Sequence, residues 1–331
     1  ATEALVAALP ASTQRIAVLD RCKDPGSQGE PLYLDVLAAL NEHWPGREMP
    51  RVVGGRYGIA SKEFTPAMVK AVFDHLRPLL APLPIVGESR PINHFSVGID
   101  DDVTHRSLPL DADGEHGFHT DQAEVRAVFY GLGSDGTVGA NKAAIKIIGE
   151  ATGLHTQGYF VYDSKKAGSV TVSHLRFGPQ PIRSTYLIRQ AQLVACHHWD
   201  FLERFDLLDL AAPGGKLLLN APWPAEQCWS QLPERVQQWI RRKGLRVFVV
   251  NAAAIAREHG LGGRINTVMQ VAFFAIAELM PLEQALSAMQ SAIQKSYGRK
   301  GEQVVAANLA AIEAARSGLQ ELVVPSEQQS A

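Results

Sequence analysis

Three shortages narrow what this chain of 331 residues can be. Cysteine occurs only at Cys22, Cys196 and Cys228, far apart and odd in number, so neither a disulfide framework nor a zinc or iron–sulfur motif is indicated, and a reducing, cytoplasmic location is expected. The net charge of −2 gives no basic footprint for nucleic acid. No apolar run approaches the roughly 20 residues of a membrane helix. We therefore expect neither a nucleic-acid partner nor a membrane.

The start of the chain is also short of signals. Residues 1–10 lack the positively charged beginning of a secretory signal peptide, and no initiator Met is present. The sequence is therefore expected to be a fragment or a processed chain.

Short apolar runs of strand type alternate with stretches of helical period along most of the chain. This alternation is typical of an α/β fold, in which right-handed crossovers make a largely parallel sheet. At this length two domains are expected. We predict a small α/β unit over residues 1–80, a linker over 81–122, and a larger Rossmann-like unit over 123–325 with a mostly parallel sheet and flanking helices.

Within the small unit, strands or helices are expected at residues 16–19, 32–43, 51–53 and 66–76. The linker is rich in proline at its start, and a short strand over 94–98 is compatible with its pattern. Its histidines are His94, His105, His116 and His119. They make a metal site conceivable, but no tight ligand spacing appears, so a solvated linking loop is favoured.

The larger unit is expected to begin with a strand at 125–130 and a helix at 138–150. Further strands are expected at residues 158–162, 170–177, 184–188, 193–196, 216–219 and 246–250. Further helices are expected at residues 237–243, 266–279, 282–297 and 302–322.

The turn between the first strand and the first helix of the larger unit has the spacing G-x-G-x-x-G, formed by Gly131, Gly133 and Gly136. Glycines here let the backbone turn tightly and approach a ligand closely. The amides at the helix start, with the positive end of the helix dipole, attract an anion. Ser134 and Thr137 add hydroxyl donors. We predict a phosphate cradle, although the motif by itself is also compatible with a merely structural turn.

The end of the next predicted strand carries a second charged group. Asp163 has the place of the acid that binds the ribose in a dinucleotide fold. Lys165 and Lys166 beside it suit an additional phosphate better than a bare ribose diol. Two solvated surface lysines are the alternative.

Two more features deserve a prediction. Arg264 and Asn266 follow a Gly-Gly turn before a long helix, which makes either a second anion-friendly helix start or simply a well-capped helix. His197 and His198 follow the strand at 193–196, where open α/β sheets place ligands. Because neighbours at a strand end point to opposite faces, at most one of these histidines is expected to reach a site.

Several long strings closely resemble the pyruvate:ferredoxin (flavodoxin) oxidoreductase family. They are Val18-Leu-Asp20-Arg21, Gly29-Glu-Pro-Leu-Tyr-Leu-Asp35, Gly54-Gly-Arg-Tyr-Gly58, Ser61-Lys-Glu-Phe-Thr-Pro66, Asn93-His-Phe95, Gly131-Leu-Gly-Ser-Asp-Gly-Thr-Val-Gly-Ala-Asn-Lys142, Tyr162-Asp-Ser-Lys-Lys166, Ser173-His-Leu-Arg-Phe-Gly178 and Gly262-Gly-Arg-Ile-Asn266. The resemblance covers nearly the whole chain. It implies an internal piece of such an enzyme, with most of a transketolase-C-terminal-like domain over residues 1–80 and the gamma domain over 123–325.

The resemblance also implies what the whole enzyme does. It would oxidise pyruvate with coenzyme A to acetyl-CoA and CO2, using thiamine diphosphate and Mg, and pass electrons through [4Fe-4S] clusters to ferredoxin or flavodoxin. The whole protein is expected to be a homodimer. Neither a thiamine-diphosphate domain nor cluster cysteines occur in this chain, so those cofactors are expected in the remaining domains and the chain alone is expected to be inactive.

In this family the gamma domain is implied to handle coenzyme A. The phosphates of coenzyme A are expected to contact Gly133, Ser134, Asp135, Gly136, Thr137, Lys165, Lys166, Arg264 and Asn266. No catalytic residue and no metal ligand is expected in this chain. Two other hypotheses remain open: a nicotinamide-dependent dehydrogenase domain, indicated by the glycine fingerprint and Asp163, and a non-catalytic scaffold that fixes the spacing of the thiamine and cluster domains.

Overall fold

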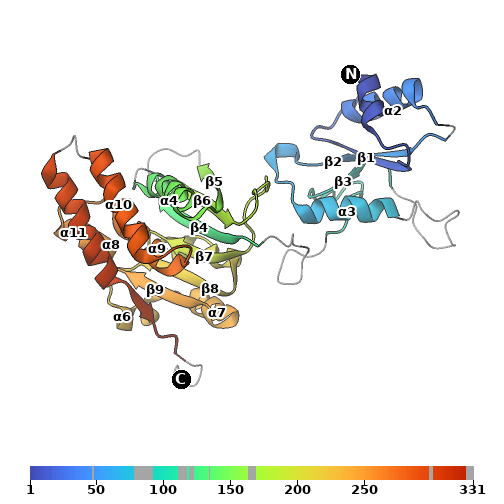
Figure 1. The fold of residues 1–331 in the computed structure, drawn as a ribbon. Coiled ribbons are helices and arrows are strands. Elements are labelled where there is room, and N and C mark those ends of the chain that lie inside the picture. Colours follow the sequence, from blue (N-terminus) through green and yellow to red (C-terminus); the bar gives the residue numbers. More distant parts are fainter. Residues whose placement is uncertain are drawn as a thin grey trace. The chain divides into compact units, whose positions relative to one another are not determined.

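The computed structural model describes residues 1–46, 48–77, 92–110, 118, 123–133, 135–162, 169–297 and 301–325. The chain divides into two compact units, Ala1–Asp121 and Gln122–Ala331. Each unit is a β-sheet with helices on both of its faces (Figure 1). The α/β class predicted from the sequence is therefore confirmed. None of the described helices has both the length and the apolar character needed to cross a membrane.

The small unit is built on a parallel three-stranded sheet in the order β1-β2-β3. Its elements are α1 (Thr2–Ala8), β1 (Arg15–Asp20), α2 (Pro31–His43), β2 (Arg51–Arg56), the 3-10 turn η1 (Ile59–Ser61), α3 (Pro66–Leu76) and β3 (Phe95–Ser96). Helices α1 and α2 pack on one face of this sheet and α3 packs on the other (Figure 1).

Strand β3 lies in the segment that the sequence predicted as a linker. It pairs with the end of β2, and the side chains of Phe95 and Val97 are fully buried among residues of β2 and α3. Leu108 is buried in the same cluster. Because these apolar side chains have a place in the core, residues 92–110 fold into the small unit despite the polar composition around them.

The larger unit contains a seven-stranded sheet in the order β10-β9-β8-β7-β4-β6-β5. Its strands are β4 (Val125–Leu132), β5 (His155–Tyr162), β6 (Val170–Gly178), β7 (Ala191–Cys196), β8 (Ala211–Asn220), β9 (Arg246–Val250) and β10 (Gln320–Leu322). Its helices are α4 (Thr137–Thr152), α5 (Phe201–Arg204), the 3-10 turn η3 (Leu207–Leu210), α6 (Ala225–Gln231), α7 (Glu234–Lys243), α8 (Ala252–Glu258), α9 (Asn266–Ala277), α10 (Leu282–Tyr297) and α11 (Glu302–Gly318).

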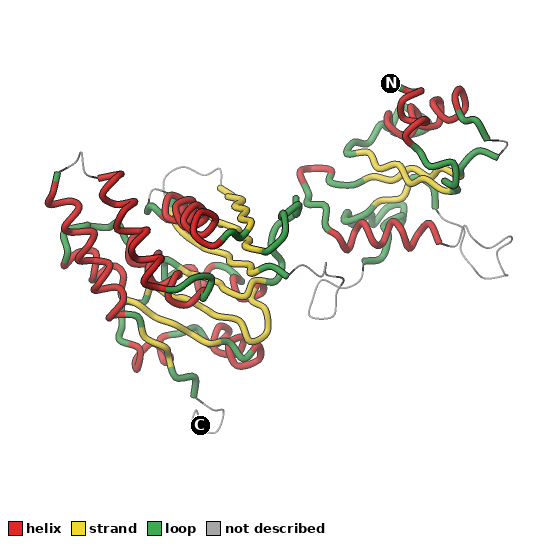
Figure 2. The backbone as a smooth tube through the Cα atoms, in the orientation of Figure 1, coloured by secondary structure: helices red, strands yellow, loops and turns green. Residues whose placement is uncertain are grey.

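Two helical layers enclose this sheet (Figures 1 and 2). Helices α4 and α8 to α11 cover one face, where Phe129 and Ala195 are buried. Helices α5 to α7 cover the other face, where Val128 and Val194 are buried. Successive strand residues thus serve opposite layers, which is why the central strands are apolar throughout.

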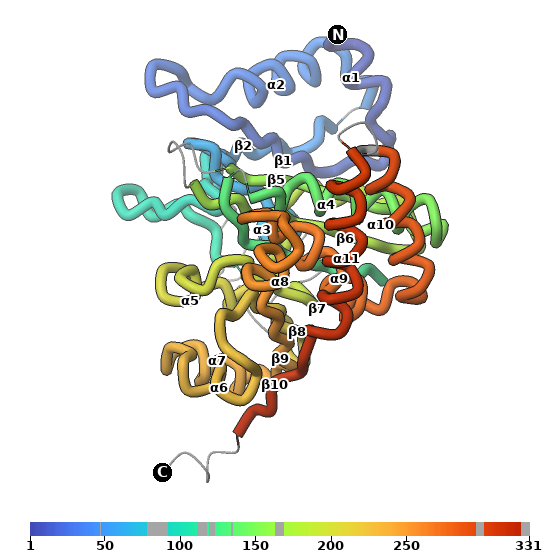
Figure 3. The backbone as a smooth tube through the Cα atoms, turned by 90° about the vertical axis from the view of Figure 1, so that its left-hand side faces the viewer, coloured from blue at the N-terminus to red at the C-terminus, as the bar shows by residue number. Residues whose placement is uncertain are grey.

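Five of the seven strands run in one direction, so the sheet is mostly parallel, as predicted, with β6 and β10 reversed. Strands β9, β8, β7 and β4 run parallel, whereas β6 is antiparallel to both β4 and β5, and β10 is antiparallel to β9. Figure 3 shows β7, β8, β9 and β10 following one another in this order. Residues 163–169, which join β5 to β6, are fewer than the dozen or more that a parallel crossover needs. This short connection is consistent with the antiparallel pairing of β5 and β6.

Two sequence predictions in the larger unit were wrong. No strand forms over 184–188, because its backbone bonds to side chains instead of a neighbouring strand: Tyr186 O accepts from Arg176 and Ile188 N donates to His174 Nδ1. The helix expected over 302–322 ends at Gly318, and β10 follows it.

Candidate functional site

The glycine-rich bend lies at a topological switch point of the sheet, where the connections from neighbouring parallel strands lead in opposite directions. After β4 the chain passes through α4 to β5 on one side, while β7 pairs with β4 on the other side. Ligands of open α/β sheets bind beyond the carboxyl ends of strands at such a point. The end of β4 therefore adjoins His197, which follows β7 and whose amide donates to Tyr130 O at 2.9 Å.

The carboxylate of Asp135 closes the bend from inside. Its two oxygens accept hydrogen bonds from the amides of Leu132, at 2.8 Å, and Thr137, at 2.7 Å. The amide of Gly133 donates to Ser169 O at 2.8 Å. These three amides therefore already have partners in the protein and are not free donors for the predicted phosphate cradle.

Asp135 is held in its charged form. Burial by itself would raise the pKa of this carboxyl, but hydrogen bonds from His198 and from the amides of Thr137 and Leu132 outweigh burial and lower the pKa to about 2. Nε2 of His198 lies 3.5 Å from the Asp135 carboxylate. The protein therefore supplies one negative charge of its own at the start of α4.

Thr137 faces the interior rather than a ligand. Its side chain is fully buried, and Oγ1 lies 2.7 Å from Nδ1 of His197, which is 2% exposed. Gly131 makes this approach feasible, because a Cβ at that position would come within 2.5 Å of Thr137 Oγ1. Burial lowers the pKa of His197 to about 4, so the imidazole is neutral at physiological pH.

Both histidines after β7 contact the bend. His197 contacts Thr137 and His198 contacts Asp135, whereas the expectation that at most one of them reaches a ligand stays a prediction. The strand ends at Cys196, and the two histidines lie in a bend of the backbone. The alternation of strand side chains therefore no longer applies to them.

The starts of α4 and α9 lie against each other. Gly136 has a φ of +90°, and a Cβ on it would lie 2.9 Å from the side chain of Asn266, the first residue of α9. The two helix starts that the sequence marked as anion-friendly, more than a hundred residues apart, are thus in contact. Two positive helix ends in one place attract an anion more strongly than either alone.

Part of this double helix start is open to solvent. Gly136 and Gly139 are exposed, and no acceptor for their amides is found among the described residues. Neither helix has an acidic residue in its first turn. Asn141 and Gln270 have buried side-chain N–H groups with no acceptor in the described part of the chain. Donors without partners are costly, which makes this region suited to an added acceptor.

The remaining predicted site residues divide into two groups. Arg264 is exposed just before α9, and its guanidinium has no partner in the described part of the chain. Ser134, Asp163, Lys165 and Lys166 lie outside the described residues. The lysine pair follows β5, whose last residue lies at the same edge of the sheet as the end of β4.

Sequence reasoning missed a row of hydrogen bonds that continues the site along the strand ends. Asn220, at the end of β8, donates from Nδ2 to His197 O at 2.9 Å and accepts at Oδ1 from Ala252 N at 3.0 Å. Asn251 caps α8 by accepting from Ala254 N at 2.9 Å. Asparagine directly after an apolar strand is the signal that marks these positions.

Metal chemistry finds no support in the part of the chain that the structure covers. No group of three or more His, Cys, Asp or Glu side chains there could hold a metal ion. Cys22, Cys196 and Cys228 are free thiols, the last two buried. His116 and His119 lie outside the described ranges.

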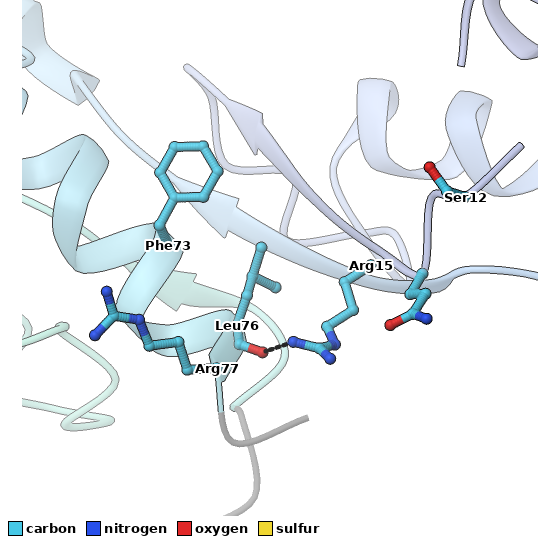
Figure 4. Close-up of a pocket in the computed structure, with 6 residues that line it drawn as sticks. Ser12, Arg15, Phe73, Leu76 and Arg77 are labelled. Carbon is cyan, nitrogen blue, oxygen red and sulfur yellow. Dashed lines mark hydrogen bonds between the residues drawn. The ribbon is translucent and has the colours of Figure 1, made fainter. Parts of the chain in front are cut away.

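A pocket of about 430 Å³ lies elsewhere, in the small unit, between Arg15, Phe73, Leu76 and Arg77 (Figure 4). Arg15 Nη1 donates to Leu76 O at 3.0 Å across it. Arg15 begins β1, so this pocket lies at the amino end of the strand. Ligands of parallel sheets bind at the opposite end, and we assign this pocket no function.

Comparison with known proteins identifies the family. The model of the pyruvate ferredoxin/flavodoxin oxidoreductase family matches residues 126–318. The chain belongs to this family. It is 55% identical over 323 residues to the pyruvate-flavodoxin oxidoreductase of Trichormus variabilis, and 51% identical over 317 residues to the pyruvate:ferredoxin oxidoreductase of Moorella thermoacetica.

The matched regions differ greatly in their share of each protein. The alignments cover 97% and 96% of this chain, but only 26% of each of those two relatives. Among solved structures, the pyruvate oxidoreductase subunit PORC of Thermotoga maritima is 18% identical, with a TM-score of 0.47, over 60% of this chain and 98% of that one. The chain therefore spans about a quarter of the length of the Trichormus and Moorella relatives.

Proposed function

We propose that the larger unit binds coenzyme A through its phosphates at the paired starts of α4 and α9. The observation that carries this proposal is the contact between Gly136 and Asn266. It joins two helix starts into one partly exposed surface, whose positive helix ends are offset in part by the Asp135 carboxylate. Exposed amides of Gly136 and Gly139 offer hydrogen bonds, and Arg264 offers a charge.

The charge already supplied by Asp135 limits how a phosphate would bind. The Asp135 carboxylate already accepts hydrogen bonds from the amides of Leu132 and Thr137. The diphosphate of coenzyme A would therefore bind the exposed amides of Gly136 and Gly139, together with the Asn266 side chain. Ser134, Lys165 and Lys166 are further proposed contacts. The lysine pair suits the 3′-phosphate, a feature that distinguishes coenzyme A from NAD.

For the whole protein we infer the activity that the names of its relatives give. It would oxidise pyruvate with coenzyme A to acetyl-CoA and CO2 and reduce ferredoxin or flavodoxin, as a homodimer. Thiamine diphosphate, Mg and the [4Fe-4S] clusters would be held by the remaining domains, since the described part of this chain offers no suitable set of ligands.

Titration calorimetry with coenzyme A tests the binding proposal. Asn266→Asp places a negative charge between the helix starts and is expected to weaken binding by about tenfold or more. The pair Lys165→Ala/Lys166→Ala should weaken it as well. Lys146→Ala is the matched control, because Lys146 is exposed farther along α4 near Glu150.

Three results would count against the proposal. They are no heat at millimolar coenzyme A, no change in the Asn266→Asp protein, and competition by NAD together with enhanced NADH fluorescence. The last result would favour the nicotinamide-dependent dehydrogenase. A scaffold role alone predicts that substitutions in the bend leave turnover of the whole enzyme unchanged.

A further inference from the structure

Three buried polar side chains lie between the first turns of α4 and the sheet beneath them. They belong to Asn141 of α4 and to Thr171 and Ser173 of β6, which are 4%, 2% and 0% exposed. In the part of the chain that the structure describes, Asn141 Nδ2, Thr171 Oγ1 and Ser173 Oγ have no hydrogen-bond partner. Unpaired buried groups are costly, and most such groups in folded proteins have a partner. These three therefore mark a place where an added hydrogen-bonding molecule would be stabilised.

The two hydroxyl groups of β6 face the side of the sheet that α4 covers. Side chains alternate along a strand, so Thr171 and Ser173 share a face with Leu175. Leu175 is buried in the same cluster as Ile148 of α4. In the register of the sheet, Thr171 lies opposite Gly131 of β4. The two hydroxyl groups thus belong to neighbouring rows of side chains under this helix.

Helix α4 brings Asn141 over the same rows. The first residue of the helix, Thr137, lies over the β4 glycine just named, because a Cβ on that glycine would come within 2.5 Å of Thr137 Oγ1. Asn141 follows one turn later on the same side of the helix. The next residue, Lys142, has its Nζ 5.3 Å from the centroid of the Phe160 ring, and Phe160 pairs with Ser173. The second turn of α4 therefore lies above β6 at the level of Ser173.

The chemistry of the three groups suits a water molecule. Asn141 Nδ2 only donates, whereas each of the two hydroxyl groups can both donate and accept. A buried water typically makes about three hydrogen bonds, to polar groups that otherwise have no partner. None of the three groups is charged, so an ion bound by them would find no opposite charge among its ligands, which is costly in a buried place.

We propose that an internal water molecule joins Asn141 of α4 to Thr171 and Ser173 of β6. It accepts a hydrogen bond from Asn141 Nδ2 and forms further hydrogen bonds with the two hydroxyl groups. The start of α4 then rests on the sheet through an exchangeable polar contact as well as through apolar packing. The water site forms whether or not coenzyme A binds.

The sign of a change in melting temperature tests this site. Thr171→Val keeps the branched shape of the side chain and removes its hydroxyl group. If that hydroxyl group binds water, its loss should lower the melting temperature of the larger unit by about 2–4 °C. A buried hydroxyl group with no partner would give the opposite sign, because a methyl group costs less to bury. An unchanged or higher melting temperature overturns the proposal.

A double-mutant cycle tests whether Asn141 and Thr171 share one molecule. Asn141→Leu has a similar volume and should displace the water, so Thr171→Val should no longer lower the melting temperature in that background. Thr156→Val is the matched control, because Thr156 lies opposite Phe177 and thus on the same face of the sheet, in β5. Its effect should be equal in both backgrounds. An equal effect of Thr171→Val in both backgrounds overturns the shared site.

A crystal structure of the chain is the second measurement, and it decides the matter if a variant does not fold. At a resolution that shows ordered solvent, a water oxygen is expected within about 2.7–3.2 Å of Asn141 Nδ2 and of the hydroxyl oxygens of Thr171 and Ser173. Direct hydrogen bonds among the three side chains, with no water between them, would overturn the proposal.

Discussion

The hydroxyl of Thr137 lies 2.7 Å from Nδ1 of His197, and both side chains are buried. This contact fastens the first residue of α4 to the residue that follows β7. Nε2 of His197 is buried without a partner in the described part of the chain. The imidazole is neutral because burial lowers its pKa to about 4.

Stability should therefore fall as pH is lowered from about 6.5 to 4. In this window the unfolded chain takes up a proton at His197 and the folded chain does not, so acid favours unfolding, by up to about 3 kcal/mol. His197→Asn, which does not titrate, should show a shallower dependence in urea unfolding. Some slope remains, because burial also lowers the pKa of His174 to about 4. Identical slopes in both proteins would contradict a buried neutral His197.

Asp135→Asn should destabilise the larger unit by about 1–3 kcal/mol at pH 7, because an amide cannot accept from both Leu132 and Thr137 without placing its own N–H against one of them. The stability that Asp135 contributes is lost when the pH falls, not when it rises. The lowered pKa of Asp135 gives stability that is complete above about pH 4 and is lost as pH falls toward 2. The difference between variant and wild type should shrink in that acid window. A difference that stays constant down to pH 2 would show that Asp135 is not charged in the folded protein.

Gly139→Ala should separate stability from binding. A Cβ at Gly139 meets nothing within 4 Å, so the change should stabilise α4 by about 0.5–1 kcal/mol. The same Cβ would stand in front of an exposed amide and keep a phosphate away, which should weaken coenzyme A by about tenfold.

Gly149→Ala is the control for this comparison. It lies in the same helix, and its Cβ would make ordinary contact with Thr156 at 3.4 Å. Thermal unfolding should show a gain of similar size, and calorimetry should show unchanged affinity. If Gly139→Ala binds coenzyme A as well as Gly149→Ala does, no phosphate approaches this turn.

The small unit offers an independent test. Glu30 is buried, and one of its oxygens accepts from Arg56 Nε at 2.5 Å. Burial would raise the pKa of Glu30, but Arg56 outweighs it and lowers the pKa. Arg56→Met should destabilise the unit by about 3–5 kcal/mol, since the buried Glu30 carboxylate loses its hydrogen-bonded partner and keeps only His94 Nδ1, 3.7 Å away. The double change Glu30→Met/Arg56→Met should cost much less, as a double-mutant cycle in urea would show.

Local patterns foretold much of this fold. The G-x-G-x-x-G turn marked the boundary between β4 and α4, and the apolar runs located the central strands to within a few residues. Strand β10 was missed because three residues are too few to show the alternation of apolar and polar side chains that predicts a strand. The run over 184–188 looked like a strand because its side chains have the right character. Its backbone partners are the side chains of His174 and Arg176, which no local pattern reveals.

The site was foreseeable only in part. Both helix starts, at Gly136 and Asn266, have local signals, but their contact follows from the strand order and is invisible in the sequence. The capture of the bend by Asp135 did have a local signal, since aspartate readily accepts from the amide two residues ahead. The roles of the predicted site residues toward a ligand stay predictions.

Strand β10 has a practical consequence. The match to the family model ends at residue 318, whereas Leu322 of β10 is buried and Glu321 forms a two-pronged ion pair with Arg246. A polypeptide that ends at residue 318 would expose one edge of β9, whose unpaired backbone N–H and C=O groups could then pair with a strand of another molecule. A shortened version of this chain should therefore keep residues 319–325, because a version without them is expected to aggregate.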